Sequence, residues 1–260
     1  MKTALRKGGK SVIALAKLVI PAPVRWKLRQ LQYWSSVLMA TSAGAGRRDC
    51  PICGYSGTFG AAGMPTRLGA ICPRCRSGER QRLLYLAIER LQFLADVRSL
   101  LHFAPENCLT KTIKKYVADY KTADLVPGKA SMVLNIEKID LPDRSFDAVI
   151  AMHVLEHVDD RAALREIRRV LVPGGMFIAA VPIIEAWATT YENPAVVSKR
   201  DRTLHFGADG HRRWYGKDFR DRLKEAGFTV EEFVGDGSET VKYGLVRGDT
   251  IFICRAEKTP

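Results

Sequence analysis

The segment SFDAVIAMHVLEHVDDRAALREIRRVLVPGGMFIAAVP, residues 145–182, decides the fold. Its first part, residues 146–152, is a short apolar run that predicts a strand buried on both faces. A helix is expected next, because Asp159 and Asp160 can cap its start. The apolar residues at helical spacing in this predicted helix are Leu164, Ile167 and Leu171.

The second half of this segment predicts a return to the sheet. Pro173, Gly174 and Gly175 are expected to end the helix, and residues 176–181 form a second apolar strand. Two buried strands joined by a helix make a parallel, right-handed crossover. Ligands of such sheets bind at the carboxyl ends of the strands, which here carry Met152 with His153 and Val181 with Pro182.

Two stretches, LPDRSFDAVIAMHVLEHVDD (141–160) and LREIRRVLVPGGMFIAAVP (164–182), resemble the class I S-adenosylmethionine (SAM)-dependent methyltransferases, in particular the type 11 group. The resemblance extends over residues 97–257. It implies an α/β fold with a Rossmann-like, seven-stranded, mostly parallel sheet and SAM as cofactor. LHFAPE (101–106) and HFGADGHRRWYGKDF (205–219) resemble a subgroup that also carries a CPxCG-type zinc module.

The charge of the chain is concentrated at its beginning. The formal net charge is +13 over 260 residues. Residues 1–48 contain ten Lys or Arg and no Asp or Glu, so most of this charge lies there. This basic, partly amphipathic arm suits a membrane surface, RNA, or a loosely packed terminal extension, and residues 41–46 predict a flexible linker. No apolar stretch approaches the roughly 20 residues of a membrane span, and no A-x-A-like cleavage site follows. The expected location is the cytoplasm, with contact at the inner membrane face as an alternative.

Four of the six cysteines form two C-x-x-C pairs within residues 49–78. Four thiolates satisfy tetrahedral zinc and leave no open position, so a structural zinc ribbon is predicted, with iron as the alternative. Paired spacing of this kind favours a metal site in a reducing compartment over a disulfide framework. The predicted ligands are Cys50, Cys53, Cys72 and Cys75.

A linking helix is predicted over residues 79–96, with Arg82 on its polar face, followed by the methyltransferase domain over residues 97–260. The first strand, residues 97–103, leads to a turn that lacks the family's usual glycines. The second and third strands are expected at residues 116–123 and 132–136, without a helix between them.

The resemblance assigns roles around the cofactor. Glu106 is expected to accept from the amino group of SAM, or else to start a helix, and Asp124 to accept both ribose hydroxyls. Asn135 stands where the family usually has Asp beside the adenine amino group. The full set of expected cofactor residues is His102, Ala104, Glu106, Asp124, Asn135, Ile136, Met152 and His153.

Methyl transfer to a hydroxyl benefits from a general base, and imidazole titrates near neutrality. The candidates are His153, His205 and His211. Residues 183–215 form a long polar and aromatic stretch that predicts a substrate lid. Its expected contacts with the acceptor are His211, Arg213 and Tyr215.

The segment from His153 to His157 also fits an H-x-x-E-H zinc pattern. That pattern needs both histidines on one helix face, whereas the helix start signals here follow both. Zinc is therefore not expected at this place.

The sequence thus predicts a SAM-dependent methyltransferase that acts on an O or N atom of a small-molecule or glycan acceptor. Two alternatives stay open. One is an RNA methyltransferase that binds RNA through the zinc ribbon and basic arm. The other is a non-catalytic zinc-ribbon scaffold with a degenerate core.

Overall fold

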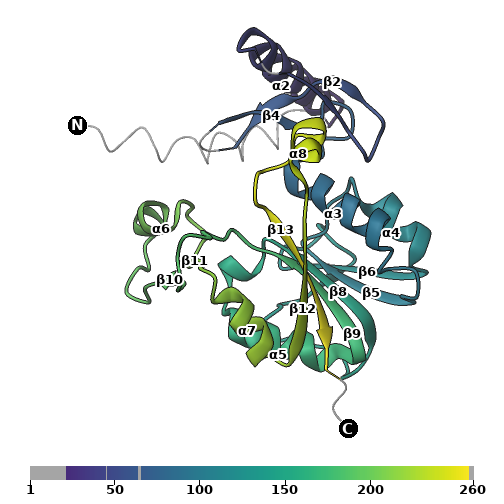
Figure 1. The fold of residues 1–260 in the computed structure, drawn as a ribbon, viewed down its shortest axis with the longest axis vertical. Helices are drawn as coiled ribbons and strands as arrows, with labels where there is room; N and C mark the ends of the chain where they lie inside the picture. Colours follow the sequence, from purple (N-terminus) through teal and green to yellow (C-terminus); the bar gives the residue numbers. More distant parts are fainter. Residues whose placement is uncertain (1–21, 45, 64–65, 258–260) are drawn as a thin grey trace. The chain divides into compact units, whose positions relative to one another are not determined.

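The computed structural model describes residues 22–44, 46–63 and 66–257. The chain divides into two compact units between Arg76 and Ser77 (Figure 1). The first 21 residues of the predicted basic arm lie outside the described residues. Every helix in the described ranges is too short or too polar to cross a membrane.

The first unit begins with α2 (Ala22–Ser42), a regular helix in the region predicted as an arm and a flexible linker. The predicted linker was wrong at its start, because Thr41 and Ser42 belong to the helix. Their hydroxyls donate to the carbonyls of Val37 and Met39, 2.9 and 3.0 Å away. The chain leaves the helix only after these two residues.

Two small antiparallel hairpins complete the first unit. They pair β1 (Arg47–Asp49) with β2 (Ser56–Thr58), and β3 (Gly60–Ala62) with β4 (Arg67–Ile71). α2 packs against β3, and Gly60 makes this approach feasible, since a Cβ there would collide with the Ser36 side chain. The helix and the hairpins therefore form one packed body.

The second unit is built on a seven-stranded sheet of order β12-β13-β9-β8-β5-β6-β7. β13 is antiparallel to both neighbours, and all other pairs are parallel. This confirms the predicted Rossmann-like sheet. The strands are β5 (Ser99–Phe103), β6 (Asp119–Asp124), β7 (Met132–Val133), β8 (Phe146–Met152), β9 (Leu171–Ala180), β12 (Phe228–Val234) and β13 (Thr250–Ala256).

Helices cover both faces of this sheet. Figure 1 shows α3 and α4 on one side and α5 and α7 on the other. As predicted, no helix joins β6 to β7. The helices of the unit are α3 (Glu79–Leu91), α4 (Thr110–Tyr116), η1 (Leu155–His157), α5 (Asp160–Val170), α6 (Lys199–Phe206), α7 (Phe219–Glu225) and α8 (Gly237–Tyr243).

The β8–α5–β9 unit forms as the apolar pattern predicts, with one correction. Asp159 caps α5 by accepting from the backbone N–H of Ala162 at 3.0 Å. The helix ends at Val170, before the predicted Pro-Gly-Gly stop, because Leu171 already has an extended backbone. Residues 173–175 instead lie within β9, where a Cβ on Gly175 would approach the carbonyl oxygen of Asp147 to 3.1 Å.

The predicted polar face of α3 also needs a correction. Arg82 is fully buried, and its guanidinium donates to the carbonyls of Ser77, Tyr243 and Gly244 at 2.6–2.7 Å. The last two carbonyls close the carboxyl end of α8, where backbone acceptors lack helical partners. A charged side chain therefore joins two helices that the sequence places far apart.

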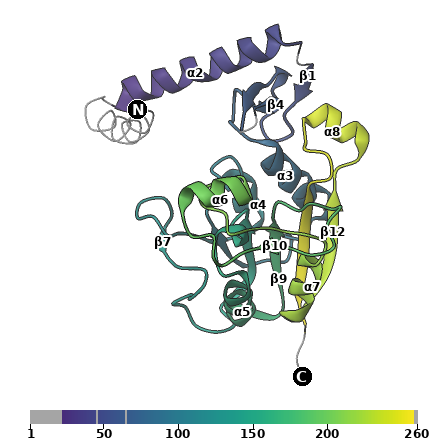
Figure 2. The same cartoon turned by 90° about the vertical axis from the view of Figure 1, so that its left-hand side faces the viewer.

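The stretch after β9 contains more regular structure than the predicted irregular lid. β10 (Tyr191–Glu192) pairs antiparallel with β11 (Arg213–Trp214), and α6 lies between them in the chain. Figure 1 shows these three elements grouped beyond one end of the sheet, and in Figure 2 α6 and β10 lie on the side that faces the viewer. The stretch leaves the carboxyl end of β9. Ligands of such sheets bind at the carboxyl ends of the strands, so the stretch begins where a ligand is expected.

Candidate active site

The carboxyl ends of β5, β6 and β8 meet at one edge of the sheet. Parallel pairing sets Phe103 opposite Ala123 on one side and opposite Ala151 on the other. The residues at or just beyond these strand ends, Ala104, Asp124 and His153, therefore share this edge. Its position agrees with the expected cofactor edge.

Ala104 and His153 both have left-handed backbone conformations, with φ of +48° and +54°. Their backbone N–H groups still donate to the neighbouring strands, to the carbonyls of Ala123 and Ala180, each at 2.8 Å. Such a conformation costs a non-glycine residue about 1–2 kcal/mol. Strained residues cluster at functional sites, and these two lie at the ends of β5 and β8 in the predicted site. The Ala104 turn takes a glycine-like conformation with a small side chain, so it fits the close approach of a cofactor.

Glu106 is held by a buried histidine. His102 is fully buried, and its ring lies 2.9 Å from the hydroxyl of Tyr120 and 2.9 Å from the Glu106 carboxylate. Burial raises the pKa of Tyr120 to about 12, so its phenol stays protonated. The helix-start alternative for Glu106 is wrong, since α4 begins only at Thr110. His102 therefore positions Glu106 instead of facing the cofactor itself.

The expected ribose and adenine residues lie in turns. Asp124 Oδ1 accepts from the N–H of Val126 at 2.8 Å, so one oxygen serves the turn and the other is available to a ligand. Asn135 follows the end of β7, and its Oδ1 accepts from the N–H of Glu137 at 3.0 Å. The amide carbonyl predicted to face adenine is thus engaged locally. Ile136 and Met152 are buried, each 3% exposed, and contribute apolar surface.

His153 pairs with a buried carboxylate. Its Nδ1 lies 3.3 Å from Oε1 of Glu156, whose side chain is 1% exposed. Burial alone would raise the pKa of Glu156, but the interaction with His153 outweighs it and holds that pKa below its usual range. An ionised Glu156 orients the ring and favours a proton on Nδ1, which leaves Nε2 as the acceptor. Sequence reasoning identified His153 but not this partner.

The other two candidate bases have different surroundings. His205 lies in α6, and its Nδ1 is 2.6 Å from the hydroxyl of Tyr191. His211 lies beside His157, with ring centroids 4.8 Å apart, and its Nδ1 is 3.1 Å from the carbonyl oxygen of Phe206. Burial lowers the pKa of His211. Of the three candidates, only His153 directly follows a strand of the sheet.

Two of the expected acceptor residues belong to the interior, so this assignment needs a correction. Tyr215 is fully buried and donates to Oδ2 of Asp160 at 2.9 Å. Arg213 is 7% exposed and donates to the carbonyls of Leu155 and Val158 at 3.0 and 2.7 Å. Each polar group is satisfied by protein partners and is not available to an acceptor.

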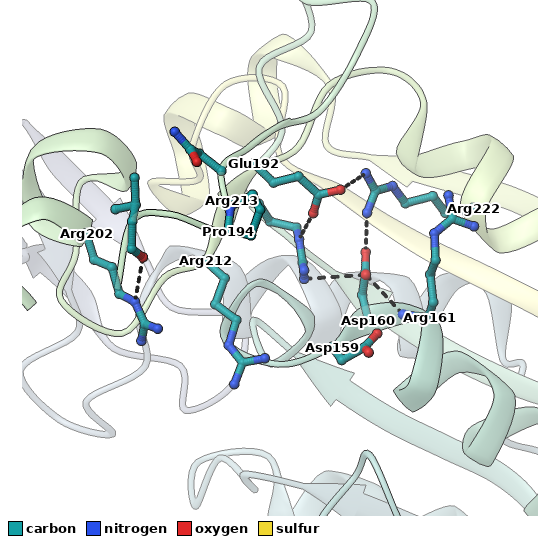
Figure 3. Close-up of a pocket in the computed structure, with 11 residues that line it drawn as sticks. Asp159, Asp160, Arg161, Glu192, Pro194, Arg202, Arg212, Arg213 and Arg222 are labelled. Carbon is teal, nitrogen blue, oxygen red and sulfur yellow. Dashed lines mark hydrogen bonds and ion pairs between the residues drawn. The ribbon is translucent and has the colours of Figure 1, made fainter. Parts of the chain in front are cut away.

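The same network joins five segments. Arg222 of α7 bridges Asp160 at 2.8 Å and Glu192 at 3.0 Å, and Glu192 also accepts from Arg213 at 2.8 Å (Figure 3). These contacts tie the start of α5, η1, β10, β11 and α7 together. We call this network of Asp160, Glu192, Arg213, Tyr215 and Arg222 the brace. It holds residues 183–215 in place over the carboxyl end of the sheet.

A cavity of about 490 Å³ opens beside this brace (Figure 3). Five arginines and three carboxylates line it, so positive charge dominates. Arg213 and Arg222 are engaged in the brace, whereas Arg202 has no carboxylate within ion-pair distance in the described part of the chain. Arg212 has only a 3.5 Å contact with Glu137, and its backbone N–H donates to the carbonyl of Glu156 at 2.8 Å. The cavity is therefore suited to an anionic group, and Arg212 connects its wall to Glu156.

The four paired cysteines of the first unit converge as predicted. Cys50 and Cys75 have Sγ atoms 3.5 Å apart, those of Cys53 and Cys72 are 3.6 Å apart, and all four lie within 4.8 Å of one another. Burial raises the pKa of the Cys53 thiol to about 11. The set could hold a metal ion, and its spacing fits tetrahedral zinc with Zn–S bonds of about 2.3 Å.

Comparison with known proteins agrees with this geometry. Residues 97–179 match the family described as "Methyltransferase domain" (Methyltransf_11). A relative from Mycolicibacterium smegmatis, described as a probable SAM-dependent methyltransferase, is 29% identical over 125 residues. These findings support a class I SAM-dependent methyltransferase core.

The extent of these matches is limited. The aligned region covers 48% of this chain and 42% of that relative, so the chain spans less than half of the relative's length. A SAM-dependent methyltransferase structure from Mesorhizobium loti aligns with a TM-score of 0.50 at 15% identity, over 68% of this chain and all of that one. This likeness shows the fold alone.

The buried brace predicts a stability effect. Tyr215→Phe removes the hydroxyl that donates to the buried Asp160 carboxylate, so we expect a loss of about 1.5–3 kcal/mol in the free energy of unfolding. Tyr191→Phe is the matched control, because Tyr191 is exposed and its hydroxyl bonds the His205 ring instead of a buried carboxylate. Urea denaturation compares the two, and equal stability of both variants would contradict the brace.

Proposed function

We propose that the chain transfers a methyl group from SAM to an O or N atom of a small-molecule or glycan acceptor that carries an anionic group. The observation that carries this proposal is the His153–Glu156 pair at the end of β8, which is tied to an arginine-rich cavity by the hydrogen bond from the Arg212 backbone N–H to the Glu156 carbonyl. The methyltransferase match over residues 97–179 supports the cofactor.

Residues at the ends of β5, β6 and β8 would hold the cofactor. The Ala104 turn gives close access to the backbone, Glu106 is oriented by His102, and Asp124 offers a carboxylate oxygen for ribose hydroxyls. When bound, SAM supplies a methyl group that is already activated by its positive sulfur. The chain's own task is alignment of the acceptor and exclusion of water.

His153 is proposed to accept the proton that the acceptor loses. Glu156 keeps Nδ1 protonated and stabilises the positive charge that the ring gains on accepting a second proton. Because Glu156 is buried, its charge acts at low dielectric and is little screened. Left-handed backbone at His153 turns the residue out of the strand direction at the site edge.

Arg202 and Arg212 are proposed to bind the anionic group of the acceptor. Their guanidinium groups line the cavity, and planar guanidinium forks match carboxylate or phosphate groups in two-point hydrogen bonding. A cavity of this volume suits a small molecule or a few sugar units. In the first unit, the four cysteines are proposed to hold one structural zinc ion.

Removal of the proposed base should lower turnover without affecting the cofactor. We expect His153→Gln to reduce kcat about 10²- to 10⁴-fold, while SAM affinity is unchanged. His205→Gln is the control, because that ring is bound to Tyr191. The assay follows labelled methyl transfer to separated small-molecule, lipid-glycan and RNA fractions. Label in RNA alone would contradict the acceptor class, and normal kcat in His153→Gln would contradict the base.

The arginine cavity generates a second expectation. Arg202→Gln should raise the KM of the acceptor about ten- to a hundredfold with little change in kcat, since a charge-assisted hydrogen bond contributes about 1.5–3 kcal/mol. Arg200→Gln is the matched control, because Arg200 lies exposed on the same helix outside the cavity. Equal KM values for the two variants would place the acceptor's charge elsewhere.

A further inference from the structure

Three potential metal ligands gather next to the proposed base. Glu156 and His157 come from η1, and His211 comes from the segment before β11. One ligand atom from each lies within 4.8 Å of the other two. The two segments are fixed to each other by the hydrogen bond from the Arg212 N–H to the Glu156 carbonyl, at 2.8 Å.

The carboxylate of Glu156 has an unused oxygen. Oε1 faces His153, whereas Oε2 is buried and has no hydrogen-bond partner among the residues that the structure describes. A buried charged oxygen without a donor is costly, and native proteins almost always satisfy such atoms. Glu156 is 1% exposed, so bulk water does not satisfy it. A cation bound beside Oε2 would remove this cost.

His211 is arranged as metal-binding histidines usually are. Its Nδ1 lies 3.1 Å from the carbonyl oxygen of Phe206, so Nδ1–H donates there and Nε2 keeps its lone pair. Histidine ligands typically donate their second ring nitrogen to a backbone carbonyl or a carboxylate, which fixes the tautomer. Phe206 belongs to α6, so the orientation of the ring is set by an element outside the cluster.

We propose that Glu156, His157 and His211 bind one divalent transition-metal ion of the zinc class. Two imidazoles and one carboxylate are a donor set of zinc sites that keep a position open for water or substrate. Nitrogen donors disfavour calcium and magnesium, which prefer oxygen.

The spacing of the cluster suits closure around an ion. A tetrahedral ion with bonds of about 2.0–2.2 Å holds its ligand atoms roughly 3.3–3.6 Å apart. The three ligand atoms here lie within 4.8 Å of one another, so they would move slightly closer to bind an ion. His157 is exposed, and its ring already lies edge-on to that of His211, with centroids 4.8 Å apart. Gly210 leaves room beside it, since a Cβ there would lie 3.0 Å from Nδ1 of His157.

The site adjoins the chemistry proposed above. Glu156 contacts the proposed base through Oε1 and would contact the ion through Oε2. An ion with an open position could bind an acceptor oxygen and favour loss of its proton. This role rests on the proposed function, whereas binding of the ion does not, and the two are tested separately.

Cobalt titration of the full chain tests the site. Co²⁺ at the four cysteines gives intense thiolate charge-transfer bands, whereas a site of two imidazoles and one carboxylate gives only weaker visible bands. We expect two equivalents to bind, the second without thiolate bands. His211→Ala and His157→Ala should each weaken binding of the second Co²⁺ ion by more than about a hundredfold and leave binding of the first unchanged. Losing a metal ligand should cost more affinity than losing a group that only hydrogen-bonds to a ligand.

Matched variants keep the result independent of folding and of methyl transfer. His205→Ala should retain both equivalents, and Cys72→Ser should weaken only the equivalent that gives thiolate bands. His157 is exposed, so its variant is expected to fold even if the His211 variant does not, and circular dichroism verifies this. A single equivalent in the unaltered chain, or a second one that survives in folded His157→Ala, would overturn the proposal.

Discussion

The parallel pairing of β8 with β5 on one side and β9 on the other is the constraint on which the second unit depends. β8 is buried along almost its whole length, so its backbone groups can be satisfied only by these two neighbours. Parallel strands end at the same edge, which brings Ala104, Asp124 and His153 together. The chemistry of the site follows from this register, because a shift of one residue would turn each side chain to the opposite face.

A buried carboxylate fixes what lies above that edge. Asp160 begins α5 and receives hydrogen bonds from Tyr215 and Arg222, while Arg213 lies 3.5 Å away. Removal of one partner from a buried charge is strongly destabilising, so this arrangement resists change. Arg212 and Arg213 both line the cavity, and Arg213 is held by the brace.

The sequence predicted the framework well because its signals are local. The apolar run of β8, the cap at Asp159 and the C-x-x-C pairs each require only neighbouring residues. The burial of Arg213 and Tyr215 could not be predicted in this way. Polar residues are buried only where partners exist, and their partner Asp160 lies more than 50 residues earlier in the chain.

Two further features of the site could not be predicted from local sequence patterns. The turn after the first strand lacks the family's usual glycines, yet Ala104 adopts the left-handed conformation that glycine usually supplies. The grouping of Glu156 with His211 depends on the path of residues 183–215. An H-x-x-E-H pattern searched on one helix cannot find a ligand that a distant segment contributes.

SAM binding at the carboxyl ends of β5, β6 and β8 can be measured by titration calorimetry of the full chain and of Asp124→Ala. We expect one site in the unaltered chain and an affinity about ten- to a hundredfold weaker in Asp124→Ala, since charge-assisted hydrogen bonds of about 1.5–3 kcal/mol are lost. Absence of SAM binding, or equal affinity in the two proteins, would contradict it.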